Sequence, residues 1–182
     1  MRFDQIVAAV QGALLLLKND ERGMQGFVLS LDGFVKSFLA VLIVLPLYAL
    51  VVLIQAADLG PELASTPLSV RLWSYALQWL AFVLTAMLLA KVMSREGQFV
   101  PYVIAANWAS VVQIAIVLAV VLLTTLLPAA MTGLVLVLMT LGLLVYDYRV
   151  VRIAFGAEGF DGMAVVGIQF MVSLLVQRLV TT

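Results

Sequence analysis

The chain has 182 residues, of which 65% are hydrophobic and 11% charged, and its net charge is zero. Soluble domains contain about 45–50% apolar and about 25% charged residues, so the composition indicates an integral membrane protein and, with few basic residues, argues against a nucleic-acid partner. The sequence has neither cysteine nor histidine, which excludes disulfides, thiol nucleophiles, imidazole bases and Cys/His metal sites, and we expect no cofactor and no enzymatic activity.

Residues 1–33 are predicted to precede the membrane bundle on its cytoplasmic side. Within them, residues 3–17 have the spacing of an amphipathic helix, with large apolar side chains on one side: Phe3, Ile6, Val7, Val10, Leu14 and Leu17. The segment is too short to span a bilayer, and Asp4 is atypical of a signal peptide. We expect this helix either to lie along the membrane surface or to pack on the end of the bundle. Ser30 is expected to cap the helix that follows.

Residues 34–182 are predicted to form the bundle itself. Five apolar stretches are candidates to cross a bilayer: 34–57, 71–91, 99–127, 129–148 and 161–180. Pro128 marks the turn between the third and the fourth. The expected fold is therefore all-α, a polytopic transmembrane helical bundle of five spans with an N-terminal amphipathic interfacial helix. The fifth stretch is the weakest because Arg178 interrupts it, so a four-span bundle with a C-terminal surface helix is the alternative.

The third stretch has two unusual faces at helical spacing. Small residues fall on one arc: Ala105, Ala109, Ala115 and Ala119. Polar residues fall on the opposite arc: Asn107, Ser110, Gln113, Thr124 and Thr125. Lipid favours neither face, so this stretch is predicted to be the central helix of the bundle, in contact with other helices on two sides.

The candidate intramembrane site is the polar face of Asn107, Ser110 and Gln113, with Gln78 on the second span and Gln169 on the fifth as candidate partners that could line the same cavity. Amides in hydrocarbon are costly unless they are hydrogen-bonded, so these side chains must face protein or water. Two interpretations remain open: hydrogen bonds that join helices, or the lining of a substrate path. Because the predicted spans contain no acidic residue apart from Asp147 and Asp161 at their borders, ion-coupled transport is disfavoured.

Four basic residues are candidates for docking a partner or a lipid headgroup: Lys36, Arg95, Arg149 and Arg152. Asp147, beside Arg149, is expected at the cytoplasmic border of the fourth span. Tyr146-Asp147 resembles the YD dipeptide of intramembrane aspartyl proteases. However, the second aspartate, Asp161, is expected in the same loop and cannot form the coupled dyad of such enzymes.

The distribution of basic residues predicts the orientation. With five spans, one set of loops carries eight of the ten basic residues, and the other set carries only Arg71 and Arg178. Positive charge favours the cytoplasmic side, so the N-terminus is predicted to be cytoplasmic and the C-terminus outside. The Leu/Val/Ala-rich composition favours a bacterial inner (cytoplasmic) membrane.

The layout resembles the Ypt-interacting protein (YIP) family of five-span membrane proteins and its uncharacterised bacterial branch. The similar segments are SLDGFVKSFLA (Ser30–Ala40), VLPLYAL (Val44–Leu50) and FVPYVIAANWASVVQ (Phe99–Gln113). The resemblance implies five spans and a cytoplasmic N-terminal segment. The family's D-L-Y-G-P motif is represented here only by Asp58-Leu59-Gly60-Pro61, which lacks the tyrosine and follows the first span. No trafficking role and no functional residue are therefore transferred.

The sequence predicts a non-enzymatic membrane protein that acts as an interaction, scaffold or accessory subunit. Its expected partners are membrane lipids and either another membrane protein or further copies of itself. The alternative is a transporter or channel for lipid or a neutral small solute that uses the polar face of the third span.

Overall fold

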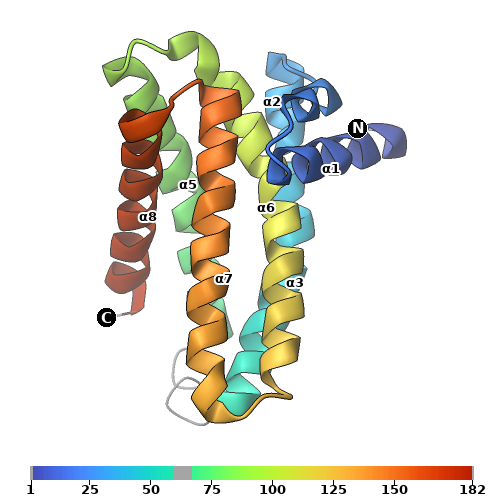
Figure 1. Ribbon diagram of the computed structural model, residues 1–182, viewed down its shortest axis with the longest axis vertical. Coiled ribbons are helices and arrows are strands. Elements are labelled where there is room, and N and C mark those ends of the chain that lie inside the picture. Colours follow the sequence, from blue (N-terminus) through green and yellow to red (C-terminus); the bar gives the residue numbers. More distant parts are fainter. Residues whose placement is uncertain (1, 60–66, 182) are drawn as a thin grey trace.

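The computed structural model describes residues 2–59 and 67–181 (Figure 1). The chain is 88% helical, and its described residues contain no strand, which confirms the predicted all-α class. Residues 60–66, in the loop that was predicted around Pro61, lie outside the described part.

Five helical segments are long and apolar enough to cross a membrane. In chain order they are α2 (Leu31–Ser37) followed by α3 (Leu39–Leu59), α5 (Leu68–Val92), α6 (Glu96–Thr124), α7 (Ala129–Val150) and α8 (Gly159–Thr181). The protein is therefore a multi-pass integral membrane protein. The last segment, Gly159–Val180, has 22 residues and is long and apolar enough to cross a membrane despite Arg178.

The fourth span extends further than its sequence indicates. α7 continues to Val150 and then into a π-helical turn, η2 (Val151–Phe155), so the membrane-length segment is Ala130–Phe155 rather than 129–148. Asp147 and Arg149 indicate a helix end, because charged residues normally border a span. Here both side chains have partners inside the protein, and the helix continues past them.

Local sequence signals account for several helix boundaries. Ser30 caps α2 as predicted, since its Oγ accepts a hydrogen bond from the Gly33 amide at 3.1 Å. Pro128 is the N-cap residue of α7, as the predicted turn requires. The turn after η2 uses Gly156 at φ 70° and Gly159 at φ 56°, a left-handed conformation that glycine adopts without steric cost.

α6 is the central helix of the bundle, as predicted. It contacts α1 (Phe3–Leu17), α2, α3, α5 and α7. The small-residue face is used over only half its length. Ala105 and Ala109 are buried, whereas Ala115 and Ala119 are exposed. The first pair of small residues is therefore packed and the second is not, because α1 crosses only the charged end of α6.

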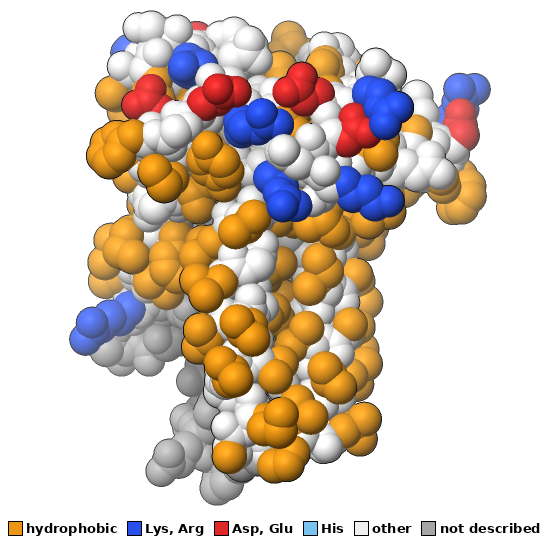
Figure 2. All heavy atoms as spheres, in the orientation of Figure 1, with side chains coloured by type: hydrophobic (Ala, Val, Ile, Leu, Met, Phe, Trp, Pro, Cys, Tyr) orange, Lys and Arg blue, Asp and Glu red, His pale blue; other side chains and the backbone are white. Residues whose placement is uncertain are grey.

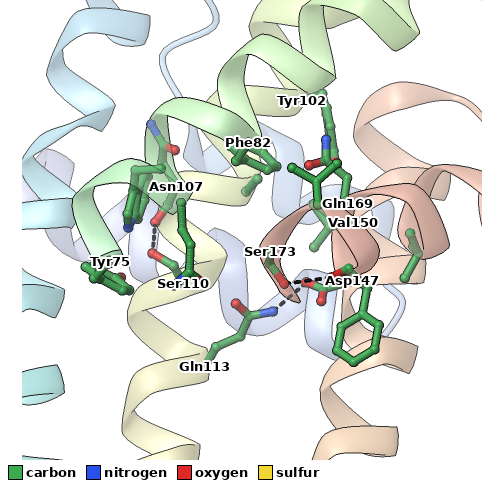
Figure 3. Close-up of a pocket in the computed structure, with 16 residues that line it drawn as sticks. Tyr75, Phe82, Tyr102, Asn107, Ser110, Gln113, Asp147, Val150, Gln169 and Ser173 are labelled. Carbon is green, nitrogen blue, oxygen red and sulfur yellow. Dashed lines mark hydrogen bonds between the residues drawn. The ribbon is translucent and has the colours of Figure 1, made fainter. Parts of the chain in front are cut away.

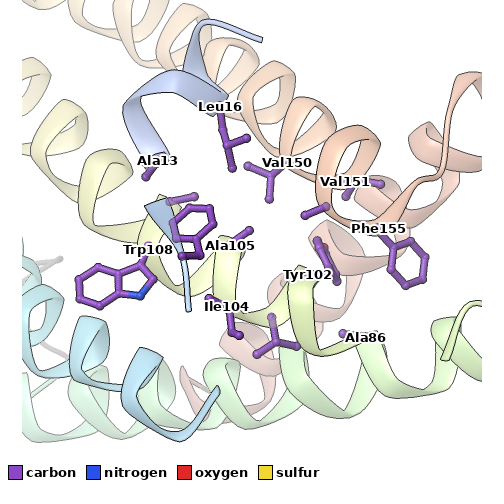
Figure 4. Close-up of a cluster of buried hydrophobic side chains, with 14 of the residues drawn as sticks. Ala13, Leu16, Ala86, Tyr102, Ile104, Ala105, Trp108, Val150, Val151 and Phe155 are labelled. Atoms are coloured by element: carbon purple, nitrogen blue, oxygen red, sulfur yellow. The ribbon is translucent and has the colours of Figure 1, made fainter. Parts of the chain in front are cut away.

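α1 lies across the end of the bundle where most charged side chains gather (Figures 1 and 2). Its small side chains face inward, and Ala9 and Ala13 are buried with Leu16 in the main apolar cluster (Figure 4). Some of its large apolar side chains face outward, with Phe3 80% exposed and Leu14 43% exposed, whereas Ile6, Val10 and Leu17 pack against that cluster. The two positions expected for this helix therefore combine: it packs on the bundle and presents an apolar face of the kind that enters a membrane interface.

Two side chains of α7 hold the C-terminal end of α1. The Tyr146 hydroxyl donates to the Ala13 carbonyl at 2.7 Å, and the Arg149 guanidinium donates to the Leu17 carbonyl. The last carbonyls of a helix lack partners within it, so Arg149 satisfies a group that would otherwise need water.

The connector after α1 folds back against it as a 3₁₀ helix, η1 (Glu21–Gly26). Asp20 begins this turn and pairs with the Arg22 guanidinium at 2.6 Å. The side-chain hydrogen bond from Arg22 lowers the pKa of the Asp20 carboxyl below its ordinary value. The backbones of α1 and η1 come so close that a Cβ on Gly12 would lie 2.5 Å from the carbonyl oxygen of Gly23.

Gly12→Ala is expected to lower the free energy of unfolding by about 1–3 kcal/mol, because the added methyl group clashes with backbone that cannot move aside. Gly133→Ala is the matched control, since a Cβ there meets nothing within 4 Å. Thermal unfolding in detergent, followed by tryptophan fluorescence, measures both variants. Equal stability of the two variants would show that the close contact between α1 and η1 does not exist.

Candidate functional site

A half-open cavity of about 250 Å³ lies between α5, α6, α7 and α8 (Figure 3). Each of these helices is of membrane length, and the lining residues fall inside α5, α6 and α8 and in the last turn of α7. The walls combine amides, hydroxyls, one carboxylate and aromatic rings, whereas the outer sides of the bundle are largely apolar (Figure 2). A mixed lining of this kind is typical of a ligand site.

All four residues of the predicted polar face line this cavity: Asn107, Ser110, Gln113 and Gln78. Gln169 of α8, which was expected to join this set, also lines the cavity, and the structure adds Ser173 of the same helix. Thr124 and Thr125, from the same predicted arc, take no part. Their hydroxyls donate to carbonyls of their own helix, Val121 at 2.7 Å and Leu122 at 2.8 Å.

Asp147 is the residue that sequence reasoning misplaced. Its carboxylate lies inside the bundle, where the Gln113 amide nitrogen donates to it at 2.5 Å (Figure 3). The expectation that acidic residues lie only at the borders of the spans is therefore wrong. Asp147 and Val150 lie three residues apart, so they share one face of α7, and both line the cavity. This helical spacing is the sequence signal that indicates an inward-facing Asp147.

The second aspartate of the protease comparison is elsewhere. Asp161 lies in the first turn of α8, where it is exposed, and it is not among the residues that line the cavity. A coupled dyad needs two carboxylates that share a proton. The cavity contains one carboxylate, so its geometry does not fit an aspartyl protease.

Asn107 serves two purposes at once. Its amide nitrogen donates to the Ser37 hydroxyl at 2.8 Å, and this bond joins α6 to α2. Both residues are completely buried. The amide oxygen, by contrast, has no hydrogen-bond partner among the described residues, although Asn107 lines the cavity. Joining helices therefore uses one half of this side chain and leaves the other half, a buried amide oxygen, without a partner among the described residues.

An aromatic layer separates the cavity from the charged end of the bundle. The Tyr102 ring lies 5.7 Å from the Phe82 ring and 5.1 Å from the Phe155 ring, centroid to centroid. Tyr102 and Phe155 are buried. On the charged side, the Arg95 guanidinium donates to the Gly156 carbonyl and so connects the start of α6 to the turn before α8. These contacts lie between the cavity and the charged end of the bundle.

The four basic residues predicted for docking are spread over the charged end. Arg95 and Arg149 bond to backbone carbonyls. Arg152 donates to the Asn19 amide oxygen at 3.0 Å and lies within 4 Å of two glutamates, Glu21 and Glu158. Lys36 forms an exposed ion pair with Asp32, one turn earlier on α2, at 2.6 Å. Three of the four therefore make long-range contacts that fix segments of this chain.

The described residues contain no group of three or more acidic side chains that would hold a metal ion. Comparison of the chain with protein-family models, with curated proteins and with solved structures finds no match. The assignment of the site therefore depends on its geometry.

The Asn107–Ser37 bond is expected to contribute about 1 kcal/mol to stability, in the range found for hydrogen bonds between membrane helices. A double-mutant cycle of Asn107→Leu and Ser37→Ala, measured by unfolding in detergent, gives this coupling energy directly. Ser110→Ala is the control, because its hydroxyl donates to the Asn107 carbonyl of its own helix. Additive effects of the first two changes would contradict the proposed contact.

Proposed function

We propose that the protein is a transporter or channel that admits a small solute or a lipid headgroup to the cavity between α5, α6, α7 and α8. The observation that carries this proposal is a polar cavity at the depth of membrane-length helices. Its volume of about 250 Å³ is close to the lower end of small-molecule sites, which begin at about 300 Å³, and fits a small ligand or headgroup.

Unsatisfied polar groups in the cavity support a ligand rather than packing alone. Neither the Asn107 oxygen nor the Gln169 amide nitrogen has a partner within the described chain. A buried polar group without a hydrogen bond costs about 1–3 kcal/mol, and hydrocarbon offers no substitute for water. Both atoms are buried in this state, so a polar ligand or water would satisfy them once the side chains around them move aside.

The distribution of charge supports an orientation for the path. The charged end, which carries α1, would face the cytoplasm of a bacterial cell, because positive charge favours that side. The aromatic layer of Phe82, Tyr102 and Phe155 then lies between the cavity and the cytoplasm. In the conformation described, a ligand would therefore enter the cavity from the lipid or from the outer side.

The scaffold or accessory role, together with membership of the YIP-like family, stays a prediction from the sequence. Three of the basic residues expected to form a docking surface, Arg95, Arg149 and Arg152, are bonded within the chain. The geometry therefore supports the transport alternative better than the docking one.

Introduced thiols test the proposal, because the chain contains no cysteine. In Ser173→Cys, the thiol is placed in the cavity wall and is expected to react with a neutral, water-soluble methanethiosulfonate in proteoliposomes. In Thr140→Cys, it is placed on the exposed side of α7, in lipid, and is expected to react at least about tenfold more slowly because thiolate does not form in hydrocarbon. Reaction rates measured by intact mass give the comparison.

Filling the cavity provides the matched control. Ala106→Trp, added to Ser173→Cys, is expected to block the reaction, because Ala106 lines the cavity. Ala115→Trp is the same change on an exposed face of the same helix and is expected to leave the rate unchanged. No reaction at position 173, or equal rates at positions 173 and 140, would overturn the proposal.

A further inference from the structure

We infer that the ligand of the cavity carries an ammonium group and that Asp147 is its counter-ion. This inference rests on the proposed function of the cavity and specifies the chemical class of its ligand. An amine headgroup of a lipid and a free small amine share the chemistry in question.

The charge of the cavity is the first argument. Among the described residues, the Asp147 carboxylate has one hydrogen-bond partner, the neutral amide of Gln113. No lysine or arginine is among the residues that line the cavity. The nearest basic residue along the helix, Arg149, bonds instead to the Leu17 carbonyl at the end of α1. A carboxylate in the membrane interior is costly unless it is paired or protonated, and a positively charged ligand would supply the pairing that the cavity lining lacks.

The aromatic lining is the second argument, independent of the first. Five rings line the cavity: Tyr75, Trp79, Phe82, Tyr102 and Phe170. The face of an aromatic ring attracts a cation, and the attraction increases when the cation is removed from water. Rings around one carboxylate form a common recognition site for ammonium groups. They offer nothing comparable to an anion.

The hydrogen-bonding groups exclude the other ligand classes. An anionic ligand, such as a phosphate or a carboxylate, would meet Asp147 with no cation to offset the repulsion. A neutral ligand such as a sugar would leave the carboxylate unpaired. An ammonium compound that also carries an oxygen atom would pair with the Asp147 carboxylate through its ammonium group. Its oxygen atom would accept a hydrogen bond from the Gln169 amide nitrogen, which has no partner among the described residues.

The experiment compares two charged reagents on Ser173→Cys in proteoliposomes. The reagents are 2-aminoethyl methanethiosulfonate, which carries an ammonium group, and its sulfonatoethyl analogue, which carries a negative charge. Each rate is divided by the rate of the same reagent with free 2-mercaptoethanol. We expect the ammonium reagent to be favoured by about tenfold, because the field of one carboxylate acts over a short distance with little water between.

Asp147→Asn is expected to abolish this preference. The new amide oxygen still accepts the bond from Gln113, so the cavity keeps its shape while it loses its charge. Asp161→Asn is the matched control, because it removes the same charge from an exposed site outside the cavity. It is expected to leave the preference at about tenfold.

Protection of the thiol distinguishes the two sources of the amine. Protection in vesicles that contain phosphatidylethanolamine, but not in vesicles of phosphatidylglycerol alone, identifies a lipid headgroup. Protection by ethylammonium chloride in phosphatidylglycerol vesicles, but not by sodium chloride at equal ionic strength, identifies a free amine. Asp147→Asn should remove either protection.

Failure of this inference differs from failure of the proposed function. If the neutral reagent reaches position 173 but the two charged reagents react at equal relative rates, the cavity is accessible and the ammonium inference is wrong. The same conclusion follows if Asp147→Asn keeps the preference, or if neither amine source protects the thiol. If no reagent reaches the position, the proposed function is wrong as well.

Discussion

Polar side chains inside a helical membrane bundle have to find partners within the protein, because hydrocarbon provides neither donors nor acceptors. In this protein that constraint acts on α6. Asn107 bonds to Ser37 of α2, and Gln113 bonds to Asp147 of α7. Two amides less than two helical turns apart thus fix the rotation of the central helix against neighbours on two sides. The cavity follows from this arrangement, since it lies on the face of α6 between these contacts and α5.

The N-terminal segment depends on the same helices. α1 meets α6 through small side chains, and Tyr146 and Arg149 of α7 bond to carbonyls near its end. Small residues allow the backbones to approach, and Phe3, Val7 and Leu14 of α1 remain exposed on the outer side. A helix with one small face and one large apolar face is suited to lie between a bundle and a membrane interface. It contributes to the packed end of the bundle, where Trp108 and Tyr146 are buried.

The region around Asp147 combines a carboxylate with irregular backbone. The π-helical turn η2 begins four residues after Asp147, and the chain then turns through Gly156 and Gly159 into α8. π-Helical turns in membrane-length helices occur frequently at functional sites, because they interrupt the regular hydrogen-bond ladder. α8 packs mainly on α5 and makes a smaller contact with α7 (Figure 1). The wall that carries Gln169 and Ser173 is therefore joined to the Asp147 wall through a turn rather than through extensive packing.

The sequence by itself determined the class of protein, the number of membrane-length segments, the cap at Ser30 and the turn at Pro128, because these depend on local composition and backbone chemistry. It also identified Asn107, Ser110, Gln113 and Gln78 as one set, since amides in hydrocarbon must face protein or a cavity. Only the tertiary structure decided that Asp147 faces inward and that Ala115 and Ala119 face outward. It also decided that Arg149 bonds to the Leu17 carbonyl at the end of α1 rather than lying on a free surface. The reason is physical: a charged residue near the end of a span is compatible with water, with a protein partner or with a buried site. Which of these it meets is set by the packing of helices that are distant in the sequence.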